Sequence, residues 1–144
     1  MSAEENKAIA RRWYEDGFNA HNVGLIDELF TADFVEHTPS GPPTNGRDKV
    51  KQGLMGVFAA LPDLRVTIDD MIAEGDKVVV RFTSRATHQG DLMGIPATGK
   101  PMTTTTITIL RFAHGKIAED WVETDMLGMM RQLGVIPTPG QTPG

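Results

Sequence analysis

Apolar positions in the first sixty residues recur at the spacing of a helix. In residues 4–18 they fall four apart and form an aromatic-rich stripe. Residues 25–30 pair apolar side chains one turn apart, and residues 48–60 repeat them at intervals of three and four before Pro62. The pattern therefore predicts three helices ahead of any strand.

The period changes to two after residue 64, which indicates strands. Residues 64–73 and 77–88 predict one hairpin, joined by the turn sequence Glu-Gly-Asp. Residues 103–112 and 116–125 predict a second hairpin, which turns through His-Gly. Helices followed by an antiparallel meander predict an α+β domain with its helices gathered on one face of a sheet.

Two loops rich in proline and glycine interrupt these elements. Residues 37–46 and residues 90–101 contain too much proline and glycine for regular structure, and we expect them to border whatever lies between the layers. Residues 126–133 predict a last short helix. We assign residues 1–135 to a single domain and residues 136–144 to a Pro/Gly-rich C-terminal tail.

Some strands carry apolar side chains on both faces. Val78, Val79 and Val80 are consecutive, and Ile107 and Ile109 with Leu110 likewise place apolar groups on both faces of their strand. Because helices can cover only one face of the sheet, we expect the outer face to meet a second copy in a homodimer or tetramer.

Composition and charge limit the classes of function. The net charge of −5 over 144 residues argues against a nucleic-acid partner, and no apolar run approaches the roughly 20 residues that span a membrane. The absence of cysteine excludes thiol nucleophiles and disulfides. No metal-ligand spacing or phosphate loop is present, so we expect no metal and no cofactor. The N-terminal residues lack the apolar segment of a signal peptide, which predicts a cytoplasmic protein.

The candidate chemistry depends on which face of strand 116–125 is buried. In strict alternation one face carries Ile117, Glu119, Trp121, Glu123 and Asp125. Trp121 is expected to be buried, and a carboxylate beside a buried ring has a raised pKa, as a general base requires. Asp125, at the sheet end, is the candidate. Glu119 has a structural alternative, an ion pair with Arg81 or Arg111.

Two histidines stand near the predicted loops. His37 follows Phe-Val-Glu at the start of one loop, where it could donate a hydrogen bond to a substrate carbonyl or simply cap the surface. His88 ends a strand and could face the same cavity or serve a structural role.

The chain resembles the SnoaL-like polyketide cyclase (ester cyclase) family of the NTF2-like superfamily. The resemblance is carried by residues 61–102 and 107–134 and by two earlier positions. The matching pieces are Phe34 with His37, Pro62-Asp63, Glu74-Gly75-Asp76, Thr87-His88 with Gly90, Gly94-Ile95-Pro96 with Thr98-Gly99, Gly115-Lys116-Ile117, Glu119 with Trp121 and Asp125, and Gln132-Leu133-Gly134. The resemblance covers nearly the whole chain apart from the tail.

The resemblance implies a cone-shaped α+β barrel in which a curved antiparallel sheet wraps three helices around an apolar pocket. It further implies dimers or tetramers and a cofactor-free intramolecular aldol cyclisation of a polyketide methyl ester, with a pocket aspartate as base. Asp125 matches that aspartate and His37 a pocket histidine, whereas Arg111 stands where family members carry another histidine. For a small hydrophobic or aromatic ligand, the expected binding residues are Trp13, Tyr14, Phe18, Phe34, His88, Arg111 and Trp121.

Other functions remain open on the same fold. One is a ketosteroid-isomerase-like proton shuttle. Another is an epoxide hydrolase, in which Arg81 or Arg111 would act beside Asp125. A third is a non-catalytic module that binds a hydrophobic ligand in the pocket.

Overall fold

The computed structural model describes residues 2–39, 41–137 and 140, and the remaining residues of the predicted tail lie outside the described part. Five helical segments are present in the described chain: α1 (Ala3–Arg12), η1 (Trp13–Phe18), α2 (Leu25–Leu29), α3 (Arg47–Ala60) and α4 (Met126–Gln132). α1 begins with a capping box, in which the Ser2 side chain accepts from the Glu5 backbone and the Glu5 side chain accepts from the Ser2 backbone. The predicted helix 4–18 therefore exists, but its last part, η1, is a π-helical turn.

Six strands form one sheet in the order β2-β1-β6-β5-β4-β3. Their bounds are β1 (Phe30–His37), β2 (Thr44–Asn45), β3 (Arg65–Glu74), β4 (Lys77–Thr87), β5 (Pro101–Ala113) and β6 (Lys116–Thr124). The two predicted hairpins, β3 with β4 and β5 with β6, are confirmed as antiparallel pairs. β1 pairs with β6 in parallel.

The prediction that three helices precede any strand is wrong, because β1 lies before α3. The two buried aromatic residues of β1, Phe30 and Phe34, are four residues apart, which imitates helical spacing. The alternation of apolar and polar residues expected of a strand is absent from β1, because its register against β6 shifts between Phe30 and Val35.

A bulge in β6 overturns the predicted phase of that strand. Ile117 pairs with Phe112 on β5, whereas Glu119 pairs with the adjacent residue Arg111, so Ala118 is one residue too many on β6. The extra residue moves every later side chain to the opposite face.

The inner face of β6 therefore carries Asp120, Val122 and Thr124, and Trp121 turns to the outer face instead of being buried. Asp120 is only 6% exposed, while Trp121 keeps partial exposure. The prediction of a buried Trp121 with Asp125 beside it is wrong because strict alternation assumed an unbroken ladder.

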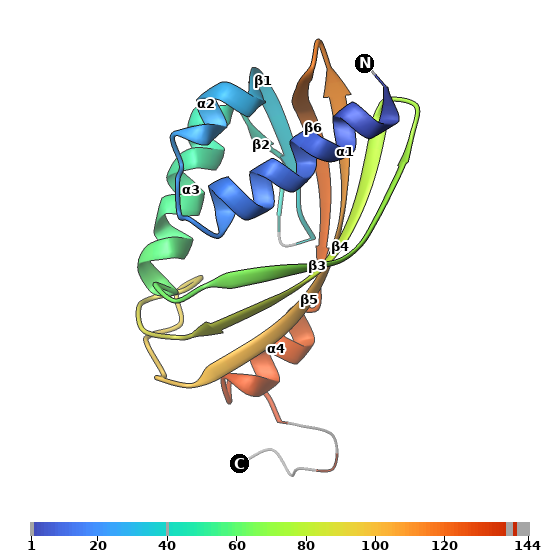
Figure 1. Ribbon diagram of the computed structural model, residues 1–144. Coiled ribbons are helices and arrows are strands. Elements are labelled where there is room, and N and C mark those ends of the chain that lie inside the picture. The colour runs from blue at the N-terminus through green and yellow to red at the C-terminus, as the bar shows by residue number, and fades with distance from the viewer. Residues whose placement is uncertain (1, 40, 138–139, 141–144) are drawn as a thin grey trace.

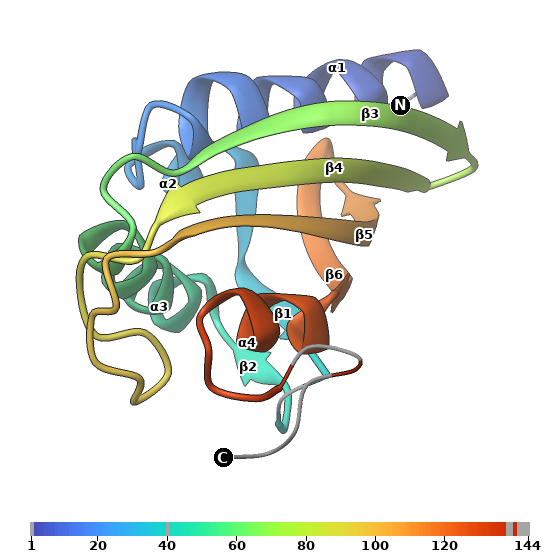
Figure 2. The same ribbon diagram turned by 90° about the horizontal axis from the view of Figure 1, so that it is seen from below.

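The sheet curves strongly, and α1, η1, α2 and α3 occupy its concave side (Figure 1). Seen from below, α4 lies beside β5 (Figure 2). The Gln132 side chain ties α4 to β5, because its Oε1 accepts from the Thr103 N–H at 2.7 Å and its Nε2 donates to the Thr103 carbonyl at 2.7 Å. These features confirm the α+β class with a curved sheet around helices.

Within the described ranges, no helix is both long enough and apolar enough to cross a membrane.

Candidate active site

A cavity of about 470 Å³ lies between the concave face of the sheet and the helices. Its apolar wall comes largely from η1 and α3, and includes Trp13, Tyr14, Phe18, Val50, Leu54, Val57 and Leu61. Residues of the two predicted loops, Thr38, Leu92 and Met93, also line it, so both loops border the cavity as expected. Its size lies within the range of small-molecule sites.

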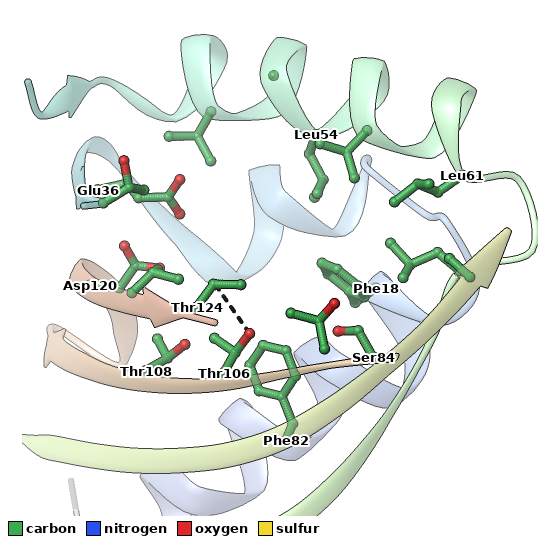
Figure 3. A pocket seen from close by; sticks show the side chains of 18 of the residues that line it. Phe18, Glu36, Leu54, Leu61, Phe82, Ser84, Thr106, Thr108, Asp120 and Thr124 are labelled. Carbon is green, nitrogen blue, oxygen red and sulfur yellow. Dashed lines mark hydrogen bonds between the residues drawn. The ribbon is translucent and has the colours of Figure 1, made fainter. Parts of the chain in front are cut away.

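The opposite wall is a row of hydroxyl groups on the inner face of the sheet. The hydroxyl side chains are Ser84, Thr104, Thr106, Thr108 and Thr124. Three of them occupy successive inward positions of β5, because alternate residues of a strand face the same side. The helical side of the cavity is therefore largely apolar, whereas its sheet side carries hydroxyl groups among apolar residues such as Phe82 (Figure 3).

Two carboxyl groups stand at one end of this polar wall (Figure 3). Glu36 and Asp120 are direct partners in the parallel pairing of β1 with β6, both line the cavity, and their side chains share a hydrogen bond. Asp120 Oδ1 is buried and has no hydrogen-bond partner among the described residues. One carboxyl oxygen of the pair thus has unused hydrogen-bonding capacity.

The environment of the pair makes ionisation of both groups unfavourable. Burial, the charge of Glu36 and the hydrogen bond with Glu36 raise the pKa of Asp120 to about 10. Burial also raises the pKa of Glu36, while the hydrogen bond from Asp120 opposes that rise. Asp120 therefore keeps its proton at neutral pH, Glu36 is the member of the pair that ionises first, and the titration belongs to the pair as a unit.

Tyr14 extends the polar group around the acid pair. Its side chain is 4% exposed and its hydroxyl is hydrogen-bonded to Thr108. Burial, followed by the nearby charge of Asp120, raises the pKa of Tyr14 well above its ordinary value. Tyr14 therefore stays a neutral phenol beside the carboxyl pair throughout the usual pH range.

The predicted binding residues divide into separate places. Trp13, Tyr14 and Phe18 line the cavity. Phe34 is fully buried in the core. His88 is also fully buried, where its Nδ1 accepts from the Thr98 N–H at 3.3 Å and lies 3.0 Å from the Thr98 hydroxyl. His88 thus organises the loop after β4.

His37, Arg111 and Trp121 gather on the outer face of the sheet. His37 Nε2 lies 2.6 Å from Glu119 Oε2, and Arg111 Nε donates to Glu119 Oε1 at 3.0 Å. The His37 ring stacks on Trp121 with ring centroids 5.3 Å apart. Glu119 therefore makes the structural ion pair with Arg111 that the sequence offered as an alternative. The hydrogen bond with His37 lowers the pKa of Glu119, and the hydrogen bond from Arg111 lowers it further.

Asp125 lies at the surface and caps α4. Its Oδ1 accepts from the Gly128 N–H at 2.9 Å, which satisfies a free donor of the first turn. The structure does not bring Asp125 or His37 to the cavity. The carboxyl groups that line the cavity are those of Glu36 and Asp120. Each directly precedes a predicted site residue in the sequence, His37 and Trp121 respectively.

A bulge signal would have been needed to find Asp120 from the sequence. In strict alternation Asp120 falls opposite Ile117, but both are buried. The large ring of Trp121, taken as buried, favoured the face that carries Glu119 and Asp125 over the face that carries Asp120. No group of three His, Asp or Glu side chains that could hold a metal occurs in the part of the chain that the structure describes.

The comparison with protein families decides the membership of this chain. The model of the SnoaL-like polyketide cyclase family matches residues 8–133. The chain belongs to the SnoaL-like polyketide cyclase family. Aklanonic acid methyl ester cyclase DnrD of Streptomyces peucetius is 46% identical over 142 residues, which cover 91% of this chain and 92% of DnrD.

Solved structures agree with this membership. A protein of Jannaschia sp. CCS1 that carries the same family name superposes with a TM-score of 0.87 at 23% identity, and covers 94% of this chain and 95% of its own, which supports the fold alone. AclR of Streptomyces galilaeus, a proposed hydroxylase, superposes with a TM-score of 0.83 at 31% identity over 94% of this chain and 100% of its own. The SnoaL-like fold therefore hosts more than one named reaction, and the site must decide between them.

Proposed function

We propose that this SnoaL-like protein closes a ring by intramolecular aldol condensation in a polyketide-like aromatic ester. The observation that carries the proposal is the hydrogen-bonded pair of half-buried Glu36 and buried Asp120 at one end of the cavity, in which Asp120 keeps its proton and Glu36 ionises first. The similarity to DnrD, named as a cyclase of a methyl ester, supports the same reaction class.

The pair supplies both halves of acid–base catalysis. Its ionised member removes the proton from a carbon between two carbonyl groups, and the electron pair of that C–H bond moves into an enolate. Its protonated member donates a hydrogen bond to the enolate oxygen. The enolate carbon then attacks a second carbonyl carbon of the same molecule. The new C–C bond forms as the C=O π bond opens, and the alkoxide takes the proton back from the pair.

The cavity contributes position rather than further chemistry. Both reacting carbons belong to one bound molecule, so walls that hold the chain folded replace a bimolecular encounter. Trp13, Tyr14 and Phe18 provide flat apolar surface for aromatic rings. Tyr14, kept neutral by burial, offers a second hydroxyl near the developing charge.

The other enzyme functions find less support. An epoxide hydrolase would need an arginine beside its aspartate, but Arg81 pairs with Asp69 at 3.9 Å and Arg111 with Glu119 on the outer face. An isomerase of the ketosteroid type would also use a carbon base. It differs from a cyclase in the product, which the assay below identifies. Loss of the carboxyl pair would leave a plain binding module unaffected except in ligand preference.

We also propose that the outer sheet face pairs with a second copy of the chain. The supporting observation is exposed apolar surface at Ile72, which is 60% exposed, and Ile107, which is 49% exposed. The cytoplasmic location stays a prediction, which fractionation of the producing cells tests.

The experiment for the proposed function follows ring closure directly. Aromatic β-keto methyl esters that carry a second ketone within reach are incubated with wild type, Glu36→Gln and Asp120→Asn, and the cyclised isomer is quantified by chromatography and mass spectrometry. We expect each substitution to lower kcat by roughly 100-fold or more, because general acid–base catalysis contributes about 10²–10⁴. Full activity in both variants would refute the assignment.

A further inference from the structure

Thr104 carries a buried hydroxyl that makes no hydrogen bond. Its side chain is 5% exposed, lines the cavity, and its Oγ1 has no partner among the residues that the structure describes. An unpaired buried polar group costs about 1–3 kcal/mol, so native proteins nearly always pair such groups. The free hydroxyl therefore calls for a partner that the chain itself does not supply.

The neighbouring hydroxyls of the same wall are satisfied within the protein. Thr106 Oγ1 and Thr124 Oγ1 lie 3.1 Å apart (Figure 3). Thr108 is hydrogen-bonded to the hydroxyl of Tyr14. Thr104 is thus distinguished from the two other inward threonines of β5 by its spare hydrogen-bonding capacity.

Ser84 adds a second hydroxyl at the same place. It is the direct cross-strand partner of Thr104 on β4, and it also lines the cavity. No hydrogen bond of the Ser84 hydroxyl is found within residues 2–39, 41–137 and 140. Side chains opposite one another on a sheet face lie about 5 Å apart at Cβ, so one ligand oxygen can reach both hydroxyls.

This hydroxyl pair lies far from the carboxyl pair. Thr104 and Thr108 are four residues apart on β5, which corresponds to roughly 13 Å at about 3.3 Å per residue, and Thr108 is the hydroxyl nearer to Asp120. Figure 3 shows Glu36 and Asp120 at one end of the cavity and Ser84 toward the other. The cavity therefore has groups with unused hydrogen-bonding capacity at both ends, whereas the threonine hydroxyls between them are paired within the protein.

We propose that Thr104 and Ser84 form a second polar subsite, which binds a neutral phenol or carbonyl oxygen at the end of the substrate remote from its reacting carbon. The oxygen is neutral because the charged side chains among the described lining residues are Glu36, Lys49 and Asp120, and none is a neighbour of Thr104 on the sheet. The assignment of the reacting end rests on the proposed function.

The subsite fixes the direction in which a long flat ligand enters. A ligand bound in reverse would place its remote oxygen against the carboxyl pair and leave the Thr104 hydroxyl unpaired. A neutral hydrogen bond contributes about 0.5–1.5 kcal/mol net, which corresponds to a preference of about 3–10-fold for a ligand that carries the remote oxygen.

Two probe esters test this preference. The first is methyl naphthoylacetate, and the second is its derivative with a hydroxyl on the ring remote from the keto ester. Dissociation constants of both esters are measured by titration calorimetry for wild type and for the double variant Thr104→Val, Ser84→Ala. We expect wild type to bind the hydroxylated ester about 3–10-fold more tightly, and the double variant to bind both esters equally.

Thr105→Val is the matched control. Thr105 is the next residue on β5, is exposed, and faces the outer side of the sheet, so its variant should keep the wild-type preference. Thermal unfolding provides a second measurement. Because the Thr104 hydroxyl is unpaired, Thr104→Val should leave Tm unchanged or raise it, whereas a structural hydroxyl would lower Tm when removed.

The outcomes separate this proposal from the proposed function. A hydroxyl preference that persists in the double variant, or a lower Tm for Thr104→Val, would overturn the subsite. Absence of α-proton exchange with either ester in wild type, together with a preference that the double variant loses, would overturn the reaction and leave the subsite intact.

Discussion

Neighbouring acidic residues of β6 have opposite electrostatic environments. Glu119 faces outward, where its hydrogen bonds with His37 and Arg111 lower its pKa. Asp120, the next residue, faces inward, where burial and Glu36 raise its pKa. A change of face by one residue therefore separates a structural ion pair from a proton-transfer group.

The raised pKa of Asp120 predicts a pH dependence of stability. The unfolded chain ionises Asp120 near its ordinary pKa of about 3.9. The folded chain holds the proton up to about pH 10. Between these values the unfolded state binds fewer protons, so the contribution to stability is full below about pH 4 and is lost as the pH rises toward the folded pKa.

Asp120→Asn removes this dependence and keeps the shape of the side chain. We expect the Tm of the variant, measured by circular dichroism, to rise relative to that of wild type as the pH increases from about pH 5 to about pH 9. Glu119→Gln is the matched control: because the pKa of Glu119 is lowered, its contribution to stability is full above the unfolded value of about 4.3 and is lost only as the pH falls below it, so this variant should run parallel to wild type between about pH 5 and about pH 9. Parallel curves for wild type and Asp120→Asn would contradict the account.

At the scale of elements, local signals in the sequence were sufficient for the hairpins. Gly75 in the first turn, and His114 and Gly115 in the second, have positive φ angles. Both turns are recognisable in the sequence as short turn segments between alternating runs. β1 was not predictable in this way. It is stabilised by parallel pairing with β6, some eighty residues later, and long-range pairing leaves no local pattern.

The candidate site was predictable only where it depends on a helix. The stripe that placed Trp13, Tyr14 and Phe18 on one face follows from helical spacing alone, and these residues line the cavity. The carboxyl pair depends instead on the bulge at Ala118, which shifts the face of Asp120, and on the unrecognised strand that carries Glu36. Neither feature has a unique signature in a single sequence.

At the scale of the whole molecule, the uncovered face of the sheet predicts an oligomer. Ile72 and Ile107 are large exposed apolar residues on this face. Ile107→Lys should convert a dimer to a monomer, because it places a charge inside the proposed apolar contact. Sedimentation velocity measures the mass, with circular dichroism as the check on folding.

Met55→Lys is the control for the oligomer. Met55 is 52% exposed but belongs to α3, on the concave side of the sheet. Its variant should remain a dimer. A wild-type protein that sediments as a monomer at micromolar concentration, or an Ile107→Lys variant that stays dimeric, would show that this face is not the interface.

Deuterium incorporation at the α-carbon of an aromatic β-keto methyl ester in D₂O is the sharpest test of the carboxyl pair as a carbon base. It reports carbon-acid chemistry without requiring ring closure, and compares wild type with Glu36→Gln and Asp125→Asn. Asparagine caps a helix about as well as aspartate, so Asp125→Asn should fold normally. We expect exchange to fall by roughly 100-fold in Glu36→Gln and to persist in Asp125→Asn. Exchange that persists in Glu36→Gln, or disappears in Asp125→Asn alone, would contradict the role of the carboxyl pair.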